Sequence, residues 1–235
     1  MAIRAVIFDM DGTINTSKKY YAAYNDYAMS ILSRILKISN DDAAKKMKEL
    51  RKVAIGFTKR VELMGVPRLQ FYREIAAMVP CKEFIKKDEK LGKMLERLHV
   101  QGYKLGLLTN TGRPLIEKIL EALGIPNETF DVLATSTETE LKPSEEPYIY
   151  IAKELGIPLQ DCAYVGDRYE MEIETAESLG MITIMLGNSL LEDSSKKGRS
   201  DYVIKKIYEI PSLLEKAVQK SSQNKISLSR APSGV

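Results

Sequence analysis

Two aspartates near the start of the chain, Asp9 and Asp11, have the spacing of paired catalytic carboxylates. They follow an apolar run at residues 5–8, and on an extended chain residues two positions apart point the same way. Their negative charges repel each other, and a divalent cation that prefers hard oxygen ligands, typically Mg²⁺, relieves that repulsion. Gly12 permits a sharp exit from the strand. Taken alone, the segment is equally compatible with a turn that carries two solvated aspartates.

Further along the chain, three more apolar segments end in residues that could serve the same site. Thr109 and Asn110 follow one of them and offer a hydroxyl and an amide, which can hold a phosphate oxygen without adding charge. Lys142 follows the next segment, and Asp167 follows the last. Open α/β sheets bind ligands at the carboxyl ends of their strands, so we expect these side chains to meet Asp9 in one site.

The order of apolar runs predicts an α/β fold with a parallel sheet. Strands are predicted for the short apolar runs at 5–8, 104–108, 132–134, 163–165 and 182–185. Amphipathic helical stretches separate most of the later runs, near 114–123, 144–155 and 170–179. This alternation is typical of right-handed βαβ units whose helices cover both faces of the sheet.

A long stretch with helical periodicity separates the first strand from the second. Its apolar residues recur at spacings of three and four, and Pro67 opens a helix that Pro80 ends. A helical insertion therefore interrupts the sheet domain after its first strand. The expected division is a sheet domain at 1–14 and 85–219, a helical insertion at 15–84, and a flexible tail at 220–235.

The four motifs together resemble those of the haloacid dehalogenase-like superfamily of aspartate-nucleophile hydrolases. In chain order they are Asp9-Met10-Asp11-Gly12-Thr13, Thr109-Asn110, Lys142-Pro143 and Gly166-Asp167. The resemblance implies a Rossmann-like core, an aspartyl-phosphate intermediate on Asp9, and Mg²⁺ held by Asp9, the Asp11 carbonyl and Asp167. It also implies that the insertion at 15–84 is a mobile helical cap over the active site.

Glu172 departs from the pattern of this family. The family commonly has a further Asp five residues after the Asp of the fourth motif, and Glu172 stands at that distance from Asp167. Its longer side chain could still hold a metal-bound water. Glu172 is therefore expected to be a weaker, water-mediated ligand of the metal.

Asp11 distinguishes between the reactions known for such a fold. An alcohol that leaves phosphorus needs a proton, whereas a halide that leaves carbon does not, so an acid at this position favours phosphate esters over haloacids. We therefore expect a magnesium-dependent phosphohydrolase of a small phosphorylated metabolite. Asp9 would attack phosphorus, Asp11 would protonate the leaving oxygen, and Thr109 and Lys142 would stabilise the phosphate charge. A phosphomutase and a phospho-accepting scaffold protein without turnover are the alternatives.

The charges are divided unevenly along the chain. Residues 15–90 contain 17 Lys and Arg against 9 Asp and Glu, whereas the rest of the chain contains 18 against 23. Because the basic residues are dispersed along helices, nucleic acid is not expected as a partner, and a funnel for small anions is preferred over a merely solvated surface. The cationic residues that could bind a substrate anion are Lys18, Lys19, Arg51, Lys59, Arg60 and Arg73.

The apolar runs also bear on the cellular location. None approaches the roughly 20 residues that span a bilayer, so no membrane partner is expected. The start of the chain leads directly into a strand instead of a charged leader with an apolar stretch, which favours a cytoplasmic protein.

Overall fold

Residues 3–187 and 200–217 are described by a computed structural model of the protein. Their strands form one six-stranded parallel sheet in the order β3-β2-β1-β4-β5-β6. In chain order the strands are β1 (Ala5–Phe8), β2 (Lys104–Thr109), β3 (Val132–Thr135), β4 (Cys162–Gly166), β5 (Ile182–Leu186) and β6 (Tyr202–Ile204). The order changes direction at β1, so the carboxyl ends of β1 and β4 border the crevice in which open sheets bind ligands. The predicted Rossmann-like parallel sheet is confirmed.

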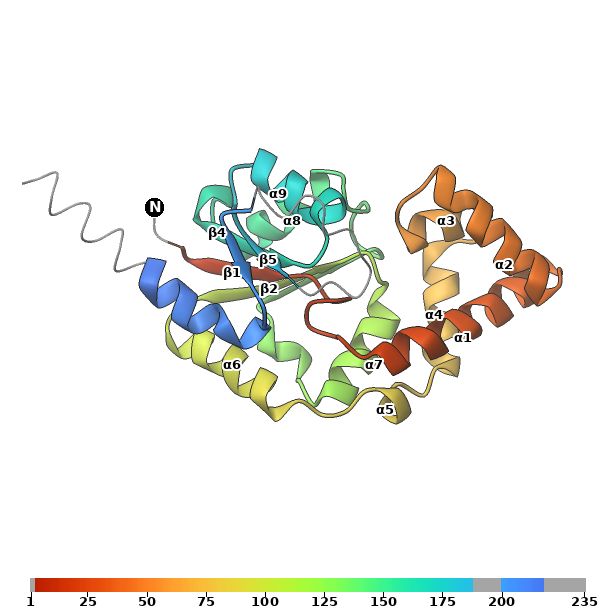
Figure 1. The fold of residues 1–235 in the computed structure, drawn as a ribbon, viewed down its shortest axis with the longest axis horizontal. Helices are drawn as coiled ribbons and strands as arrows, with labels where there is room; N and C mark the ends of the chain where they lie inside the picture. Colours follow the sequence, from red (N-terminus) through yellow and green to blue (C-terminus); the bar gives the residue numbers. More distant parts are fainter. Residues whose placement is uncertain (1–2, 188–199, 218–235) are drawn as a thin grey trace, which may run out of the picture.

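Helices cover both faces of the sheet because successive strand residues are buried on opposite sides. Val6 and Phe8 belong to one apolar cluster, whereas Ala5 and Ile7 belong to another. The first cluster includes residues of α6 (Glu89–Val100) and α7 (Arg113–Leu123), and the second includes residues of α8 (Glu146–Leu155) and α9 (Glu174–Ser178). Figure 1 shows these pairs on either side of the sheet.

The chain between β1 and α6 forms a separate group of helices beyond the carboxyl ends of the strands (Figure 1). They are α1 (Lys18–Leu36), α2 (Asn40–Glu49), α3 (Phe57–Leu63), α4 (Arg68–Met78) and the short α5 (Cys81–Phe84). The Ser17 hydroxyl caps α1 by accepting a hydrogen bond from the Tyr20 amide. All of these helices fall within the insertion predicted at 15–84, which we call the cap. The tail predicted at 220–235 lies outside the described residues.

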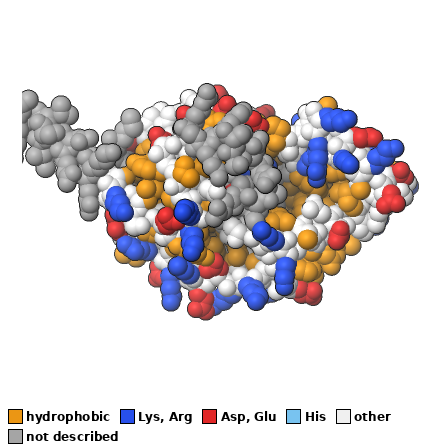
Figure 2. Space-filling model, viewed as in Figure 1, with side chains coloured by type: hydrophobic (Ala, Val, Ile, Leu, Met, Phe, Trp, Pro, Cys, Tyr) orange, Lys and Arg blue, Asp and Glu red, His pale blue; other side chains and the backbone are white. Residues whose placement is uncertain are grey.

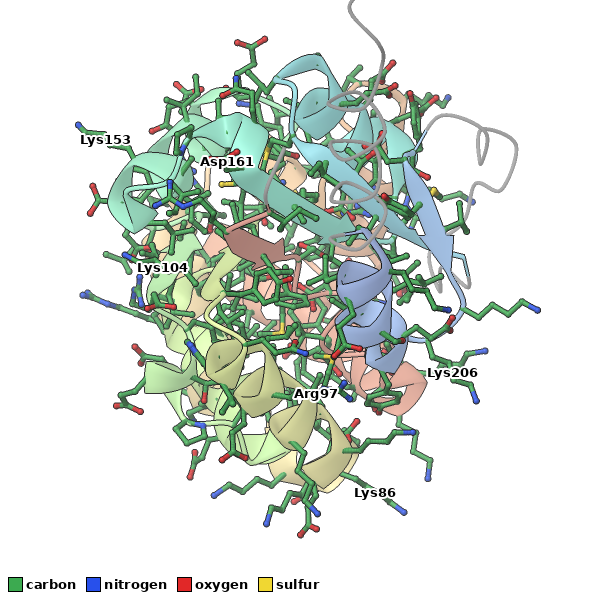
Figure 3. The ribbon with its side chains drawn as sticks, turned by 90° about the vertical axis from the view of Figure 1, so that its left-hand side faces the viewer. Lys86, Arg97, Lys104, Lys153, Asp161 and Lys206 are labelled. Carbon is green, nitrogen blue, oxygen red and sulfur yellow. The ribbon has the colours of Figure 1, made fainter. Side chains whose placement is uncertain are left out.

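Lys and Arg side chains gather over α2 and α3, at the outer part of the cap (Figure 2). The opposite end of the molecule carries dispersed charges: Lys104 begins β2, Asp161 precedes β4, and both lie on the face seen from the amino ends of the strands (Figure 3). The polar residues that follow the strands therefore lie at the other end, between the sheet and the cap. None of the helices in the described ranges combines the length and apolar character needed to cross a bilayer.

Candidate active site

Asp9 lies directly after β1, and its side chain is almost fully buried. Its Oδ1 accepts a hydrogen bond of 2.6 Å from Lys142 Nζ, while its Oδ2 has no hydrogen-bond partner among the described residues. Burial and the Glu172 carboxylate raise the pKa of Asp9 well above its usual range, and Lys142 opposes this shift. The cluster around Asp9 thus holds more negative charge than its own cations balance.

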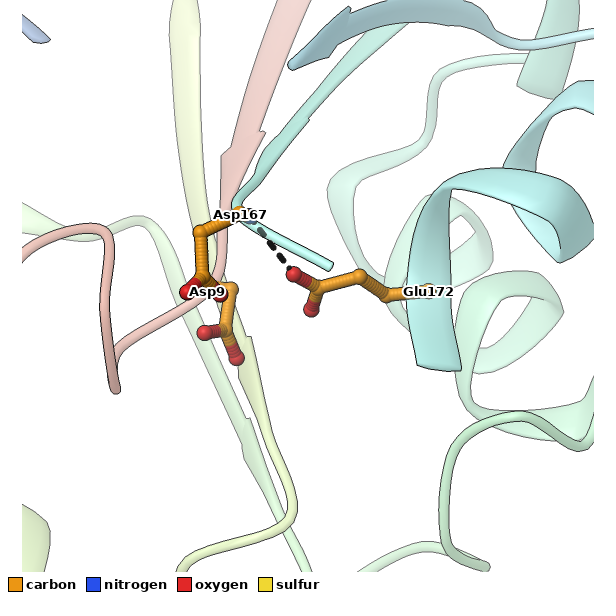
Figure 4. Close-up of side chains that lie close together, drawn as sticks. All are labelled: Asp9, Asp167 and Glu172. Atoms are coloured by element: carbon orange, nitrogen blue, oxygen red, sulfur yellow. Dashed lines mark hydrogen bonds between the residues drawn. The ribbon is translucent and has the colours of Figure 1, made fainter. Parts of the chain in front are cut away.

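Asp167 brings a second carboxylate to the same place from the end of β4. Oxygens of Asp9, Asp167 and Glu172 lie within 4.8 Å of one another, and Figure 4 shows the three side chains converging. Gly12 makes this approach possible, because a Cβ there would lie 2.2 Å from Asp167 Oδ2 and its φ is 98°. This buried group of carboxylates, with the open Oδ2 of Asp9, fits a hard divalent cation such as Mg²⁺.

Glu172 lies on the π-helical turn Tyr169–Ile173 that follows β4, and both of its oxygens are engaged within the protein. Oε1 accepts hydrogen bonds from the amides of Asp167 (2.8 Å) and Arg168 (3.1 Å), and Oε2 accepts from Lys142 Nζ (2.8 Å) and the Tyr164 hydroxyl (3.0 Å). Burial acts to raise the pKa of Glu172, but Lys142 and Arg168 outweigh it and lower the pKa. The carboxylate therefore orients Lys142 and the Asp167 loop.

Lys142 connects the two halves of this cluster. Besides Asp9 and Glu172, its Nζ lies 2.7 Å from the Tyr164 hydroxyl and 3.1 Å from the Leu108 carbonyl. Burial acts to lower the pKa of Lys142, but the two carboxylates raise it above its usual range, so the side chain stays an ammonium. A fixed positive charge beside Asp9 is suited to neutralising a phosphate oxygen.

Asp11 lies in a different environment from Asp9, although it is only two residues away. Its Oδ2 accepts a hydrogen bond of 2.6 Å from the Thr111 hydroxyl, and the Tyr21 hydroxyl lies 3.3 Å from its Oδ1. Burial raises the pKa of Asp11, and the hydrogen bonds from Thr111 and Tyr21 partly oppose the shift. A carboxyl group with a raised pKa is suited to general acid catalysis near neutral pH.

Thr109 and Asn110 end β2 beside this pair. The Thr109 Oγ1 accepts a hydrogen bond from the Thr111 amide (3.1 Å), which fixes the turn that carries Thr111. The Asn110 side chain donates to the Lys142 carbonyl and accepts from the Lys142 amide, both at 2.8 Å. Asn110 therefore joins the second and third motif loops through its side chain, while direct contact of Thr109 or Asn110 with phosphate stays a prediction.

A cavity of about 480 Å³ separates the cap from the ends of the strands. Asp11, Thr111 and Arg168 line it from the sheet side, and aromatic and cationic side chains line it from the cap. The cap contacts the sheet domain at the edge of the cavity, where the Thr58 hydroxyl donates a hydrogen bond of 2.7 Å to the Asn110 carbonyl. The cavity thus places space for a small molecule directly beside the acid.

Four residues at the site were not singled out for these roles from the sequence: Tyr21, Thr111, Tyr164 and Arg168. Thr111 directly follows Thr109 and Asn110 in the sequence. Its position next to the second motif was the signal that could have identified it. Tyr164 is hidden within an apolar strand. Tyr21 is one of several tyrosines at helical spacing, which read as packing.

The fold and site define a class of α/β proteins in which carboxylates meet at the carboxyl ends of neighbouring parallel strands. Residues 3–180 match the haloacid dehalogenase-like hydrolases. The chain belongs to this family, as its four motifs predicted, and is an enzyme of the hydrolase class.

Two relatives with named activities align over nearly the whole chain. The glyceraldehyde 3-phosphate phosphatase of Methanocaldococcus jannaschii is 28% identical and is aligned over 91% of this chain and 97% of its own length. The phosphoglycolate phosphatase of Xylella fastidiosa is 27% identical over 91% of this chain and 92% of its own. Both are phosphatases, the class of enzyme that the sequence predicted.

Solved structures share the fold. A phosphatase of this family from Thermococcus onnurineus superposes with a TM-score of 0.68, at 24% identity over 90% of this chain and 98% of its own. A β-phosphoglucomutase from Clostridium difficile superposes with a TM-score of 0.58, at 20% identity over 92% of this chain and 99% of its own. The same architecture therefore occurs in phosphatases and in a mutase, and the fold does not separate the two activities.

Proposed function

We propose that the protein is a magnesium-dependent phosphatase of a small phosphorylated metabolite, with Asp9 as nucleophile and Asp11 as general acid and base. The observation that carries this proposal is the different setting of the two aspartates. Asp9 is held by Lys142 inside a charged cluster, whereas Asp11 borders the cavity and accepts hydrogen bonds from the uncharged hydroxyls of Thr111 and Tyr21. The named phosphatase activities of relatives aligned over nearly the whole chain support hydrolysis over transfer to a second sugar.

In the first step a carboxylate oxygen of Asp9 bonds to phosphorus as the bond from phosphorus to the ester oxygen breaks. Asp11 gives its proton to that oxygen, so an alcohol leaves. Lys142 and the Thr109 hydroxyl stabilise charge on the other phosphate oxygens. In the second step Asp11, now a carboxylate, takes a proton from a water whose oxygen bonds to phosphorus. The bond from phosphorus to the Asp9 oxygen breaks, inorganic phosphate leaves, and Asp9 is regenerated.

Asp9 and Asp167 would hold Mg²⁺, together with the Asp11 carbonyl that the resemblance implies, and Glu172 would reach the ion only through water. When bound, the ion supplies positive charge that offsets both the carboxylates and the phosphate. The excess of carboxylates over cations in the cluster and the open Oδ2 of Asp9 support this assignment.

The two aspartates can be tested separately by changing the leaving group. Asp9→Asn should form no phosphoenzyme with any substrate. Asp11→Asn should slow phosphoenzyme formation from an alkyl phosphate by roughly 10²–10⁴-fold, the usual contribution of general acid catalysis. It should slow formation from an activated aryl phosphate far less, because a phenolate leaves without help.

Rapid-quench measurement of the single-turnover burst gives the comparison, because Asp11 also acts in the later hydrolysis step. If the aryl and alkyl phosphates lost burst rate by the same factor, Asp11 would not be the acid. A phosphoenzyme formed by Asp9→Asn would remove Asp9 as nucleophile.

A further inference from the structure

Arg60 is a buried cation in the cavity, and no anionic side chain in the described part of the chain pairs with it. Only 8% of its surface is exposed, and it lines the cavity that Asp11 also borders. Its Nε is buried without a hydrogen-bond partner among the described residues. Burial lowers the pKa of Arg60, and the neighbouring cations Arg51 and Arg168 act in the same direction. A guanidinium ion nevertheless stays protonated in proteins, so Arg60 brings to the cavity a positive charge that no ion pair among the described residues neutralises.

An aromatic ring of the cap lies beside this guanidinium group. Arg60 and Phe57 lie three residues apart on α3, and the Arg60 Cζ lies 5.9 Å from the centre of the Phe57 ring. The helix is tied to the sheet domain one residue after Phe57, by the hydrogen bond from Thr58 to the Asn110 carbonyl. Asn110 precedes Thr111, the partner of Asp11. Arg60 therefore enters the cavity from the cap helix α3.

A second cation faces the same cavity from the sheet side. Arg168 also has a buried Nε without a hydrogen-bond partner among the described residues. The negative charges of Glu172, Asp9 and Asp167 raise the pKa of Arg168 despite its burial. Arg168 thus belongs electrostatically to the catalytic cluster, whereas the cations nearest to Arg60 only repel it. Of these two buried cations, Arg60 on the cap is therefore the one that lacks a counter-ion among the described residues.

From this geometry we infer that the cavity selects phosphate monoesters that carry a second anionic group, a carboxylate or a second phosphate, and that Arg60 binds it. The inference rests on the proposed phosphatase function and adds the class of substrate. A guanidinium group offers a planar fork of donors that matches either anion, and such charged hydrogen bonds are strongest where water is excluded. The phosphate end would lie at Asp9 and the second anion across the cavity at Arg60.

This substrate class discriminates between the chemistries named for the two relatives. Phosphoglycolate combines a phosphate with a carboxylate, whereas glyceraldehyde 3-phosphate has an uncharged aldehyde at the end opposite its phosphate. An aldehyde would leave the Arg60 charge buried and unpaired, which disfavours its binding. The cavity is therefore expected to favour an acid over the corresponding aldehyde.

The test compares substrates that differ only in the second group. 3-Phosphoglycerate and glyceraldehyde 3-phosphate differ only as carboxylate and aldehyde, and propane-1,3-diol bisphosphate and 3-hydroxypropyl phosphate differ only in the second phosphate. We expect kcat/KM of the wild-type enzyme to be roughly 10- to 100-fold higher for the doubly anionic member of at least one pair. The pair that shows the preference identifies the anion as carboxylate or phosphate.

Two substitutions on adjacent residues then separate contact from overall charge. Arg60→Met should reduce the preference to within about threefold, mainly by raising KM for the doubly anionic substrate. Lys59→Met removes the same charge from the same helix, but Lys59 is exposed, pairs with Glu62 at 3.3 Å and does not line the cavity, so the preference should persist. Arg60→Lys, which keeps the charge without the fork, should retain part of it. Circular dichroism of each variant reports folding.

Equal kcat/KM within both wild-type pairs would overturn the inference, and so would an equal effect of Arg60→Met and Lys59→Met. The wild-type comparison holds even if a variant fails to fold. An aryl phosphate without a second charge distinguishes failure of the phosphatase proposal from failure of the anion site at Arg60. If the enzyme hydrolyses the aryl phosphate but shows no preference within either substrate pair, only the anion site is refuted. If it hydrolyses no phosphate ester at all, the phosphatase proposal itself is refuted.

Discussion

Substitutions of two ion-paired residues, Lys142 and Asp9, should change stability in opposite directions. Lys142→Met removes the ammonium group that contacts Asp9 at 2.6 Å and Glu172 at 2.8 Å, and leaves two buried carboxylates without it. Breaking a buried ion pair from one side typically destabilises by about 3–5 kcal/mol. Asp9→Asn leaves Lys142 paired with Glu172, and an Asn oxygen can still accept its hydrogen bond. That substitution removes like-charge repulsion and should stabilise the metal-free protein by about 1 kcal/mol while abolishing activity.

The charges at the site explain the difference in sign. Asp9, Asp167 and Glu172 bring three negative charges against the two positive charges of Lys142 and Arg168, so these five side chains have a net charge of −1 when all are ionised. Asp9→Asn brings that net charge to zero, whereas Lys142→Met takes it to −2. Burial prevents water from screening the imbalance.

Urea unfolding at neutral pH with EDTA measures both effects. The chain has no Trp, so circular dichroism is the suitable probe. Lys153→Met is the control, since Lys153 is exposed on α8 and points away from the molecule in Figure 3. Its unfolding free energy should stay within about 0.5 kcal/mol of wild type. Loss of stability in Asp9→Asn, or a Lys142→Met change no larger than that of the control, would refute the charge argument.

The pH dependence provides a second check on the same variants. The pKa of Asp9 is raised in the folded protein, so folding binds a proton and stability falls as pH rises from the ordinary value of 3.8 through the raised pKa. The Asp9→Asn protein does not lose stability in this way as the pH rises, because it has no carboxyl group to titrate at position 9. Its advantage over wild type should therefore be largest near neutral pH and disappear as pH falls toward 3.8. An advantage that grows on acidification would contradict the assignment.

Three further outcomes are expected. EDTA should abolish turnover, and added Mg²⁺ should restore it. In a titration with Mg²⁺, Asp167→Ala should raise the Mg²⁺ concentration that gives half-maximal activity. Glu172→Ala, which releases Lys142, should mainly lower kcat in the same titration. Thr111→Val removes a hydrogen bond that favours the carboxylate form of Asp11, so the pKa of Asp11 should rise. In the pH profile of phosphoenzyme formation, the basic limb should move to higher pH, and the rate of phosphoenzyme formation should fall roughly tenfold. Higher ionic strength should raise KM for a dianionic substrate more than it lowers kcat, and a salt-independent KM would contradict the funnel.

The sheet was predictable because its central strands are buried on both faces and read as continuous apolar runs. The strand predicted at 104–108 corresponds to the observed strand Lys104–Thr109, and the strand predicted at 182–185 corresponds to Ile182–Leu186. β6 (Tyr202–Ile204) was not predicted. It is three residues long, lies at the edge of the sheet, and exposes half of Val203, so it lacks the continuous apolar character of a central strand.

The convergence of Asp9, Lys142 and Asp167 was predictable for a different reason. Parallel strands end at the same edge of the sheet, so residues that directly follow them must lie near one another. The Tyr164 contact with Lys142 was not predictable, because a tyrosine inside an apolar strand reads as core and only the packed structure shows where its hydroxyl lies. The engagement of both Glu172 oxygens likewise depends on the π-helical turn, which apolar periodicity does not reveal.

The cap shows why a count of charges could not identify the recognition residue. Lys18, Lys19 and Lys59 are as basic as Arg60, but they are exposed, and water and salt screen charges of that kind. Arg60 differs because the Thr58 hydrogen bond to Asn110 joins segments 52 residues apart and buries its helix against the catalytic loops. Exposed cations can attract any anion over a distance, whereas a buried one discriminates by contact. On the functions proposed above, the exposed cations of the cap would act on the rate of encounter, whereas the choice of substrate would depend on Arg60, the cap cation that the fold withdraws from water.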